Sequence, residues 1–251
     1  KCRLAKPGTL CDVFRMSLAA SPESEEPSKS SSATIPFIIL LAGLSAFGPI
    51  SIDMYLPAFP AITKEFHASN GSAEITLAAF LLSAGIGQAV YGPLSDRFGR
   101  RLPLIAGCLL YILGAVWATM AHSIPELTAA RLLQGFGSSS GMVIGRAVVR
   151  DLYNQNEAAR MFSLLMLIMG AAPILAPWIG GELLGFMSWR GIFAVTALFG
   201  LAILAKTLLV LPETLPQNRR TRGGAKTAFH NFKILLTDKN FLGYVLTAGF
   251  T

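Results

Sequence analysis

The chain has 251 residues, of which 53% are hydrophobic and only 14% charged, and its mean hydropathy is +0.55. Soluble domains carry about 25% charged residues, so a water-soluble fold of this length would lack the charged surface that it needs. The net charge is +7, but the basic residues fall between apolar runs without interleaved aromatics, which argues against nucleic-acid binding. The composition indicates a membrane protein.

The first 34 residues predict a disordered cytoplasmic arm. Residues 17–34 are rich in Ser, Pro and Glu, a composition that does not bury enough apolar surface to fold. The chain does not begin with Met, so Met16 is a candidate start, and residues 1–15 would then be an upstream extension that is not native. No basic region followed by a short apolar core and a small-residue cleavage site is present, which argues against a cleaved signal peptide.

Six apolar runs of membrane-spanning length follow the arm. A span needs roughly 20 mostly apolar residues, and lipid-spanning backbone must be helix or closed barrel. The runs are too long and too uniformly apolar for barrel strands, so we expect helices. They cover about 36–60, 75–94, 102–121, 126–149, 160–181 and 190–211, and a seventh begins near Phe241 and is cut off at Thr251.

The distribution of Lys and Arg predicts a cytoplasmic N-terminus. Basic residues are concentrated in alternate loops, after the second, fourth and sixth runs, and loops of this kind face the cytoplasm. The intervening loops hold little more than Lys64 and Arg190. We therefore expect a six-helix transmembrane bundle at 35–211, a basic cytoplasmic linker at 212–240 and the start of a seventh helix at 241–251. This is the layout of a two-halved transporter whose second half is missing.

The segment GPLSDRFGRR falls in the turn between the second and third runs. Its glycines permit a tight reversal, Asp96 can cap the start of the next helix, and the arginines hold the turn on the cytoplasmic side. A generic positive-inside turn explains the arginines but not the ordered spacing. The segment resembles the loop signature of the major facilitator superfamily. The residues of this conformational loop motif are Gly92, Asp96, Arg97, Gly99, Arg100 and Arg101.

The fourth run carries the segment RLLQGFGSSSG, which resembles the RxxQG motif of the proton-coupled drug antiporters in that superfamily. Arg131 lies about six residues inside the run, where a charge costs about 2.5–3.5 kcal/mol on insertion scales. The alternative is an arginine that extends to the nearby interface. The glycines and serines suit close helix packing.

Asp53, in SIDMYLP, is the acid of the first run. It lies about seven residues below the outer end, so that Asp53 and Arg131 are both roughly 9–10 Å deep. Three interpretations remain open: a pair across a central cavity, a proton-carrying Asp53 whose pKa Arg131 tunes, or a purely structural ion pair. Tyr55 and Gln134 are further candidates to line the cavity. The phrase SIDMYLPAFPAI closely resembles the first helix of the bicyclomycin-resistance (Bcr/CflA) branch.

The fifth run contains GAAPILAPWIGG, which resembles the antiporter motif of drug exporters. Its prolines should kink the helix, and its glycines allow close packing. Ala176 departs from the family pattern, which has Gly there, and a kinked helix without antiport meaning is the alternative. The motif residues are Gly170, Pro173, Pro177, Gly180 and Gly181.

The resemblance implies an all-α membrane protein with the N-terminal six-helix bundle of the major facilitator fold, two inverted three-helix repeats, plus the start of helix 7. It implies a multi-pass protein of the bacterial inner membrane that exports drugs or small apolar compounds in exchange for protons. The expected partners are the small-molecule substrate, protons, the lipid bilayer and a C-terminal half with helices 7–12.

Two alternatives to drug export remain: an exporter of a sugar or amino-acid derivative, and a truncated fragment that does not transport. An enzyme is not expected, because no phosphate-binding GxxxxGK loop or ligand cluster occurs. The cysteines Cys2, Cys11 and Cys108 lack metal-ligand spacing, so we expect no metal and no cofactor.

Overall fold

The computed structural model describes residues 35–69 and 71–220 and the single positions 237, 243 and 247. The predicted arm at 1–34 lies outside the described residues. Apart from those single positions, so do the linker beyond residue 220 and the start of a seventh helix.

Helices build the whole of the described chain, in which no strand occurs. The predicted all-α fold is confirmed, and each of the predicted runs coincides with helix, the first being divided by a break. The elements are α2 (Ile35–Asp53), η1 (Leu56–Ala58), α3 (Phe59–Glu65), α4 (Ser72–Phe98), α5 (Arg101–Thr119), α6 (Ile124–Leu152), α7 (Gln155–Phe186), α8 (Trp189–Val210) and η2 (Gln217–Arg219).

Five described segments are long and apolar enough to cross a membrane: Ile35–Glu65, which joins α2 to α3, and the helices α4, α5, α7 and α8. The helix α6 covers the fourth predicted span but is not among these five segments, and it carries Glu126, Arg131, Arg146 and Arg150. Within this helix Arg131 and Gln134 are completely buried against other helices. Side chains that face other helices do not have to be compatible with lipid.

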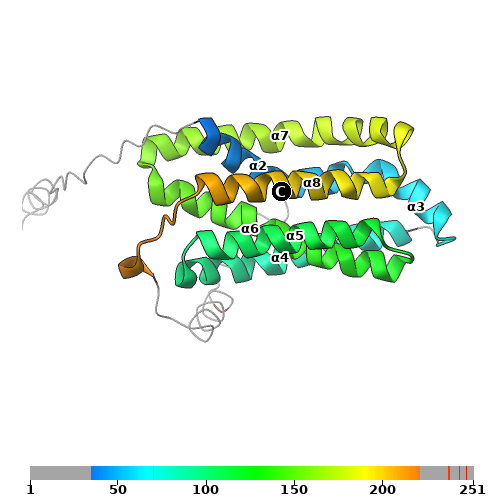
Figure 1. Ribbon diagram of the computed structural model, residues 1–251, viewed down its shortest axis with the longest axis horizontal. Coiled ribbons are helices and arrows are strands. Elements are labelled where there is room, and N and C mark those ends of the chain that lie inside the picture. The colour runs from blue at the N-terminus through cyan, green and yellow to red at the C-terminus, as the bar shows by residue number, and fades with distance from the viewer. Residues whose placement is uncertain (1–34, 70, 221–236, 238–242, 244–246, 248–251) are drawn as a thin grey trace, which may run out of the picture. The chain divides into compact units, whose positions relative to one another are not determined.

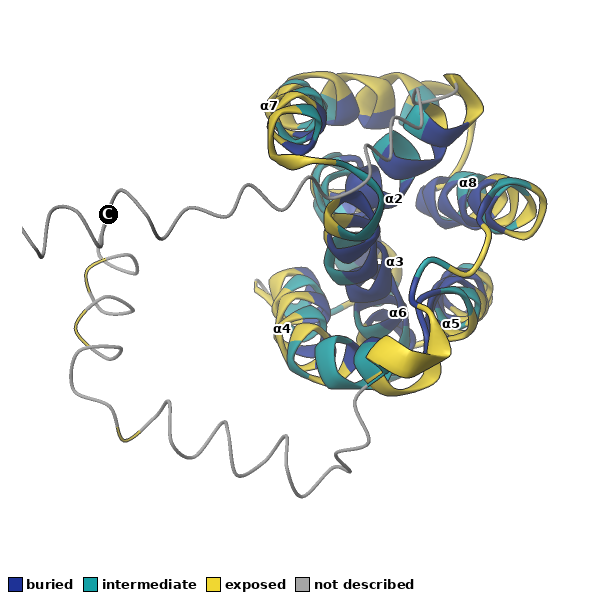
Figure 2. Ribbon diagram, turned by 90° about the vertical axis from the view of Figure 1, so that its left-hand side faces the viewer, coloured by how far each residue is buried: buried dark blue, intermediate teal, exposed yellow. Residues whose placement is uncertain are grey.

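The helix α6 lies inside the bundle, in contact with α2, α4 and α5 (Figure 2). Small residues permit this arrangement. A Cβ at Gly135, Gly137 or Gly141 would lie 2.3–2.6 Å from backbone atoms of α4, α5 and α2, respectively. Each of these glycines therefore allows one neighbouring helix to approach the α6 backbone closely.

The helix α7 lies at the outside of the bundle and packs mainly against α2 (Figures 1 and 2). Its outward surface is apolar: Met166, Ile174, Trp178 and Phe186 are 72%, 75%, 65% and 85% exposed. Its first turn is closed by its own residues, because Asn154 and Glu157 form a reciprocal capping box.

Candidate functional site

The first membrane segment is interrupted directly after Asp53. Pro57 has no N–H to donate to the carbonyl four residues earlier, which is that of Asp53, and its ring would clash with that carbonyl in a continued helix. The chain therefore turns through Met54 and Tyr55 into η1 and α3. The sequence predicted a single helix over 36–60, so the break is a correction. It places Asp53 at a helix end.

The Asp53 carboxylate is partly exposed. It makes no hydrogen bond or ion pair with any residue in the described part of the chain. The ion pair with Arg131, one of the interpretations that the sequence left open, is therefore not formed in this structure. The two residues are linked only through the backbone, because Arg131 Nη2 donates to the carbonyl oxygen of Ser51 at 3.1 Å.

Arg131 is completely buried on α6, with an exposed fraction of 0%. Its guanidinium carbon lies 4.6 Å from the ring centroid of Tyr55, 4.2 Å from that of Phe80 and 5.7 Å from that of Phe193. Nη1 donates to Gln134 Oε1 at 2.9 Å, whereas Nε has no hydrogen-bond partner. Aromatic faces and neutral oxygens thus surround a charge that no described carboxylate neutralises.

Hydrogen bonds extend this arrangement to the neighbouring helices. Gln134 Nε2 donates to Thr196 Oγ1 of α8 at 3.3 Å, and the hydroxyls of Ser51 and Tyr111 lie 2.7 Å apart. We refer to the group as the polar centre. Its members are Ser51, Tyr55, Tyr111, Arg131, Gln134 and Thr196.

The structure therefore brings Tyr55, Arg131 and Gln134 together in a buried cluster, and that they line a substrate cavity stays a prediction. It adds Phe80 and Phe193, which the sequence analysis did not single out. Each is one of many aromatic residues in apolar helices, and nothing in their sequence positions indicates that both contact the same guanidinium. A guanidinium buried in a membrane helix is stabilised by aromatic faces, and this requirement could have indicated that aromatic residues of other helices lie around Arg131.

The loop motif is mostly helical. The helix α4 continues through Phe98, so the turn contains only Gly99 and Arg100, and Asp96 belongs to the last turn of α4. Asp96 does not cap α5, contrary to expectation. The backbone N–H groups of Arg100 and Arg101 donate instead to the carboxylate of Glu213, at 2.8 and 3.4 Å. A distant carboxylate thus satisfies N–H groups at the start of α5.

Arg100 joins three helices at this turn. Its guanidinium donates to Ser95 Oγ at 2.7 Å and Asp96 Oδ1 at 2.6 Å on α4, and to Asp151 Oδ2 at 2.9 Å on α6. Burial opposes its charge, but the hydrogen bonds and charges of Asp151 and Asp96 outweigh burial and raise the pKa of Arg100. We call Ser95, Asp96, Arg100, Asp151 and Glu213 the Arg100 junction.

Gly99 has a specific reason to be glycine. Its φ of +92° lies in a region that L side chains rarely adopt, and a Cβ there would lie 2.3 Å from Glu213 Oε2. The Arg97 guanidinium carbon lies 5.1 Å from the centroid of the Phe98 ring.

The antiporter motif lies on α7, which continues as helix through Pro173 and Pro177. Its glycines have different surroundings. A Cβ at Gly170 or Gly181 would meet nothing within 4 Å, whereas one at Gly180 would lie 2.4 Å from the carbonyl oxygen of Met54. Only Gly180 among them contacts the break beside Asp53.

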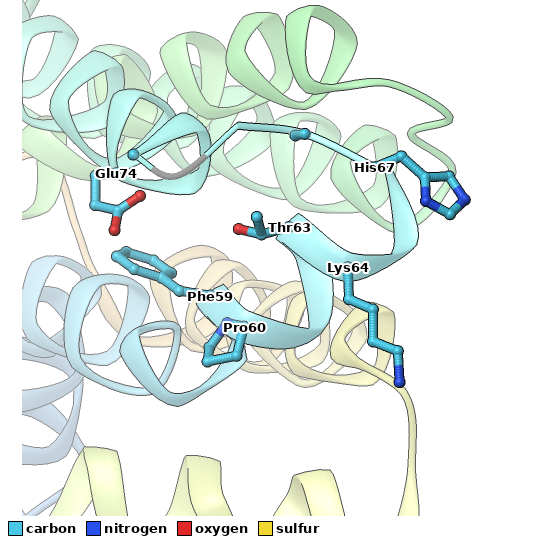
Figure 3. Close-up of a pocket in the computed structure, with 8 residues that line it drawn as sticks. Phe59, Pro60, Thr63, Lys64, His67 and Glu74 are labelled. Atoms are coloured by element: carbon cyan, nitrogen blue, oxygen red, sulfur yellow. The ribbon is translucent and has the colours of Figure 1, made fainter.

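A separate hollow of about 610 Å³ lies between α3 and the start of α4. Figure 3 shows that Glu74 points toward Phe59 and Thr63, whereas Lys64 and His67 extend outward. It contains no member of the polar centre and none of the predicted site residues.

Comparison with known proteins shows the family of the chain. The model of the Major Facilitator Superfamily matches residues 39–251. The uncharacterized MFS-type transporter YdgK of Bacillus subtilis is 42% identical over 84% of this chain and 53% of its own length. The bicyclomycin resistance protein homolog of Haemophilus influenzae is 34% identical over 87% of this chain and 55% of its own length.

Further relatives include the multidrug resistance protein D of Escherichia coli, 30% identical over 84% of this chain and 53% of its own length. The human organic anion transporter MFSD10 (TETRAN) shares the fold with a TM-score of 0.63 at 16% identity, over 77% of this chain and 52% of that one. The chain spans about half the length of the curated relatives that it matches. The resemblance stated from the loop, helix and antiporter motifs is confirmed: this multi-pass membrane chain belongs to the major facilitator superfamily.

Proposed function

We propose that this chain supplies the N-terminal six helices of a proton-coupled exporter of drugs or small apolar compounds. The observation that carries the proposal is the polar centre, in which Arg131 is buried with no described carboxylate, while Asp53 stands free at the end of α2, two residues after the Ser51 carbonyl that Arg131 binds. A structural ion pair would have satisfied both charges. The names of the bicyclomycin and multidrug resistance relatives support export of this substrate class.

In the proposed cycle, Asp53 takes up and releases a proton. A carboxylate without a fixed partner has no ion pair to break before it is protonated. Arg131 remains against the rings of Tyr55 and Phe80 and holds a positive charge two residues from Asp53 along the chain, through its hydrogen bond to the Ser51 carbonyl. Release of the proton creates an attraction between Asp53 and Arg131 that protonation removes, and this difference biases the helix break toward one of two positions.

The proposal extends to the setting of the chain. We place it in a bacterial inner membrane with the N-terminus in the cytoplasm, because the alternate loops are basic. Helices 7–12 would complete the transport pathway. The Arg100 junction would then lie on the cytoplasmic side and the hollow of Figure 3 on the outer side.

Export by the full-length protein carrying Asp53→Asn tests the proposal. In inverted membrane vesicles we expect proton-driven drug transport to be lost, while drug binding in detergent is retained. Glu74→Gln is the matched control, because Glu74 is an exposed acid at the start of α4 and should leave transport unchanged. Unchanged proton-driven transport by Asp53→Asn would contradict the proposed coupling.

A further inference from the structure

We propose that Gly180 is a positioning residue for proton coupling: it seats α7 against the Met54 carbonyl and so fixes the helix break that carries Asp53. The inference rests on the proposed function. It assigns to one glycine of the antiporter motif a contact within this bundle.

The contact is between two backbones. A Cβ at Gly180 would lie 2.4 Å from the Met54 carbonyl oxygen and 3.0 Å from both the carbonyl carbon and Cα of Met54. Real Cβ atoms essentially never approach within 3.0 Å, and no flexible side chain is present to move aside. In glycine a hydrogen atom occupies the position of the Cβ. Any larger residue must displace either α7 or the break.

The site of contact is buried on both sides. Met54 is 4% exposed, and Ala176, one helical turn before Gly180 on the same face of α7, is also 4% exposed. The helix α7 contacts η1 as well as α2, so it spans the interruption from one side to the other. The helix α7 therefore supports a segment in which Pro57 interrupts the helical hydrogen bonds.

Met54 connects this contact to the polar centre. It stands between Asp53, the last residue of α2, and Tyr55, whose ring lies 4.6 Å from the Arg131 guanidinium carbon. A displacement of the Met54 carbonyl must change the backbone on both sides of it. Asp53 would then move relative to the polar centre, which changes the surroundings in which its carboxylate takes up and releases a proton.

The motif contains its own control. A Cβ at Gly181, the next residue, meets nothing within 4 Å, and Gly181 is exposed whereas Gly180 is buried. The two glycines share a helix and nearly the same depth. A general effect of alanine on α7 would therefore be equal for both, whereas an effect through Met54 belongs to Gly180 alone.

The test compares Gly180→Ala with Gly181→Ala in the full-length protein. Proton-driven drug export is measured in inverted vesicles as a function of pH, together with drug binding in detergent. We expect Gly180→Ala to displace the pH of half-maximal export by about one unit, with drug binding retained. Gly181→Ala should follow the wild-type profile. A wild-type profile for Gly180→Ala, or equal displacement by both variants, would overturn the inference.

A second variant covers the case in which Gly180→Ala does not reach the membrane. Ala176→Gly removes a buried methyl group one turn earlier, in the same buried cluster as Met54, and so weakens the packing of α7 against the break without a steric clash. Its pH profile should also be displaced, and a wild-type profile would count against the inference. If Asp53→Asn leaves proton-driven export intact, the proposed function itself fails. If Asp53→Asn abolishes coupling but both seat variants keep the wild-type profile, only the role of Gly180 fails.

Discussion

The helices α6 and α7 are consecutive in the chain, and each carries a family motif, but their surroundings differ. The helix α6 is enclosed by α2, α4 and α5, and both motif side chains, Arg131 and Gln134, are completely buried. The helix α7 contributes one face to the bundle, and Pro173 and Gly181 of its motif are exposed. The more polar helix is thus inside and the more apolar helix outside, the reverse of a soluble protein.

The contrast shows that glycines in the two motifs serve different purposes. On α6 each glycine of the central stretch admits a neighbouring helix, so the whole stretch is needed for packing within this bundle. On α7 only Gly180 has such a reason in the described part of the chain. Three predictions separate the interior role of α6 from the peripheral role of α7.

The largest effect is expected from Arg131→Lys. Lysine keeps the charge but loses the planar group that lies against three rings and donates to Gln134 and Ser51. A desolvated cation–π contact contributes about 2 kcal/mol. Since about 1.4 kcal/mol corresponds to a factor of ten, drug export by the full-length protein should fall about tenfold or more.

Arg160→Lys is the matched control on α7, where the arginine is exposed near the start of the helix. Export by this variant should equal that of the wild type. If Arg131→Lys also exports normally, charge alone is sufficient at that position, and the aromatic surroundings of Arg131 do not matter for transport.

The sequence predicted the helical fold well because the hydropathy of a membrane-spanning helix follows directly from the bilayer. It located Arg131 and Gln134 because a charge in an apolar run is costly and so stands out. It did not reveal the break after Asp53, although Pro57 and Pro60 were visible. Prolines are tolerated within membrane helices, so a proline alone does not separate a kink from an interruption.

The Asp53–Arg131 pair, one of the interpretations left open, rested on matched depth and opposite charge. Matching depth constrains one coordinate and leaves rotation about each helix axis undetermined. The rotation of α6 instead directs Arg131 toward the rings of Tyr55, Phe80 and Phe193. The role of Glu213 was likewise hidden, because its contact with Arg100 joins residues 113 positions apart.

The next prediction concerns glycine substitutions that compare the two helices directly. A Cβ at Gly137 of α6 would lie 2.3 Å from the Tyr111 amide nitrogen and 2.6 Å from the Gly107 carbonyl oxygen. Gly137→Ala should therefore destabilise the protein by about 1–3 kcal/mol, as overpacking does. Gly170→Ala on α7 meets nothing and should be neutral or slightly stabilising, because glycine within a helix costs about 0.5–1 kcal/mol relative to alanine.

Thermal unfolding of the purified protein in detergent provides the measurement for both glycine variants. Equal melting temperatures for the two variants would mean that α6 is no more closely packed against its neighbouring helices than α7 is. The comparison between an enclosed and a peripheral helix would then be wrong.

The smallest effect concerns how the ends of the two helices are held. The last turn of α6 is tied through Asp151 to Arg100, whose backbone is held by Glu213, whereas the first turn of α7 is capped by Glu157 of the same helix. Partial burial acts to raise the pKa of Glu213, but the N–H groups of Arg100, Leu215 and Arg101 outweigh it, and the net pKa lies below the ordinary 4.5.

A lowered pKa means that this carboxylate stabilises the folded state fully above pH 4.5, and that the contribution disappears as pH falls through the lower, folded-state value. Glu213→Gln should therefore cost about 0.5–1.5 kcal/mol at neutral pH and progressively less in acid. Melting temperatures of variant and wild type, measured from neutral pH downward, should converge. Glu157→Gln is the control: because its contact stays within the first turn of α7, it should cost less than Glu213→Gln at neutral pH. A difference between Glu213→Gln and wild type that stays constant into acid would show that the Glu213 charge contributes nothing, and that the two helix ends are held in the same way.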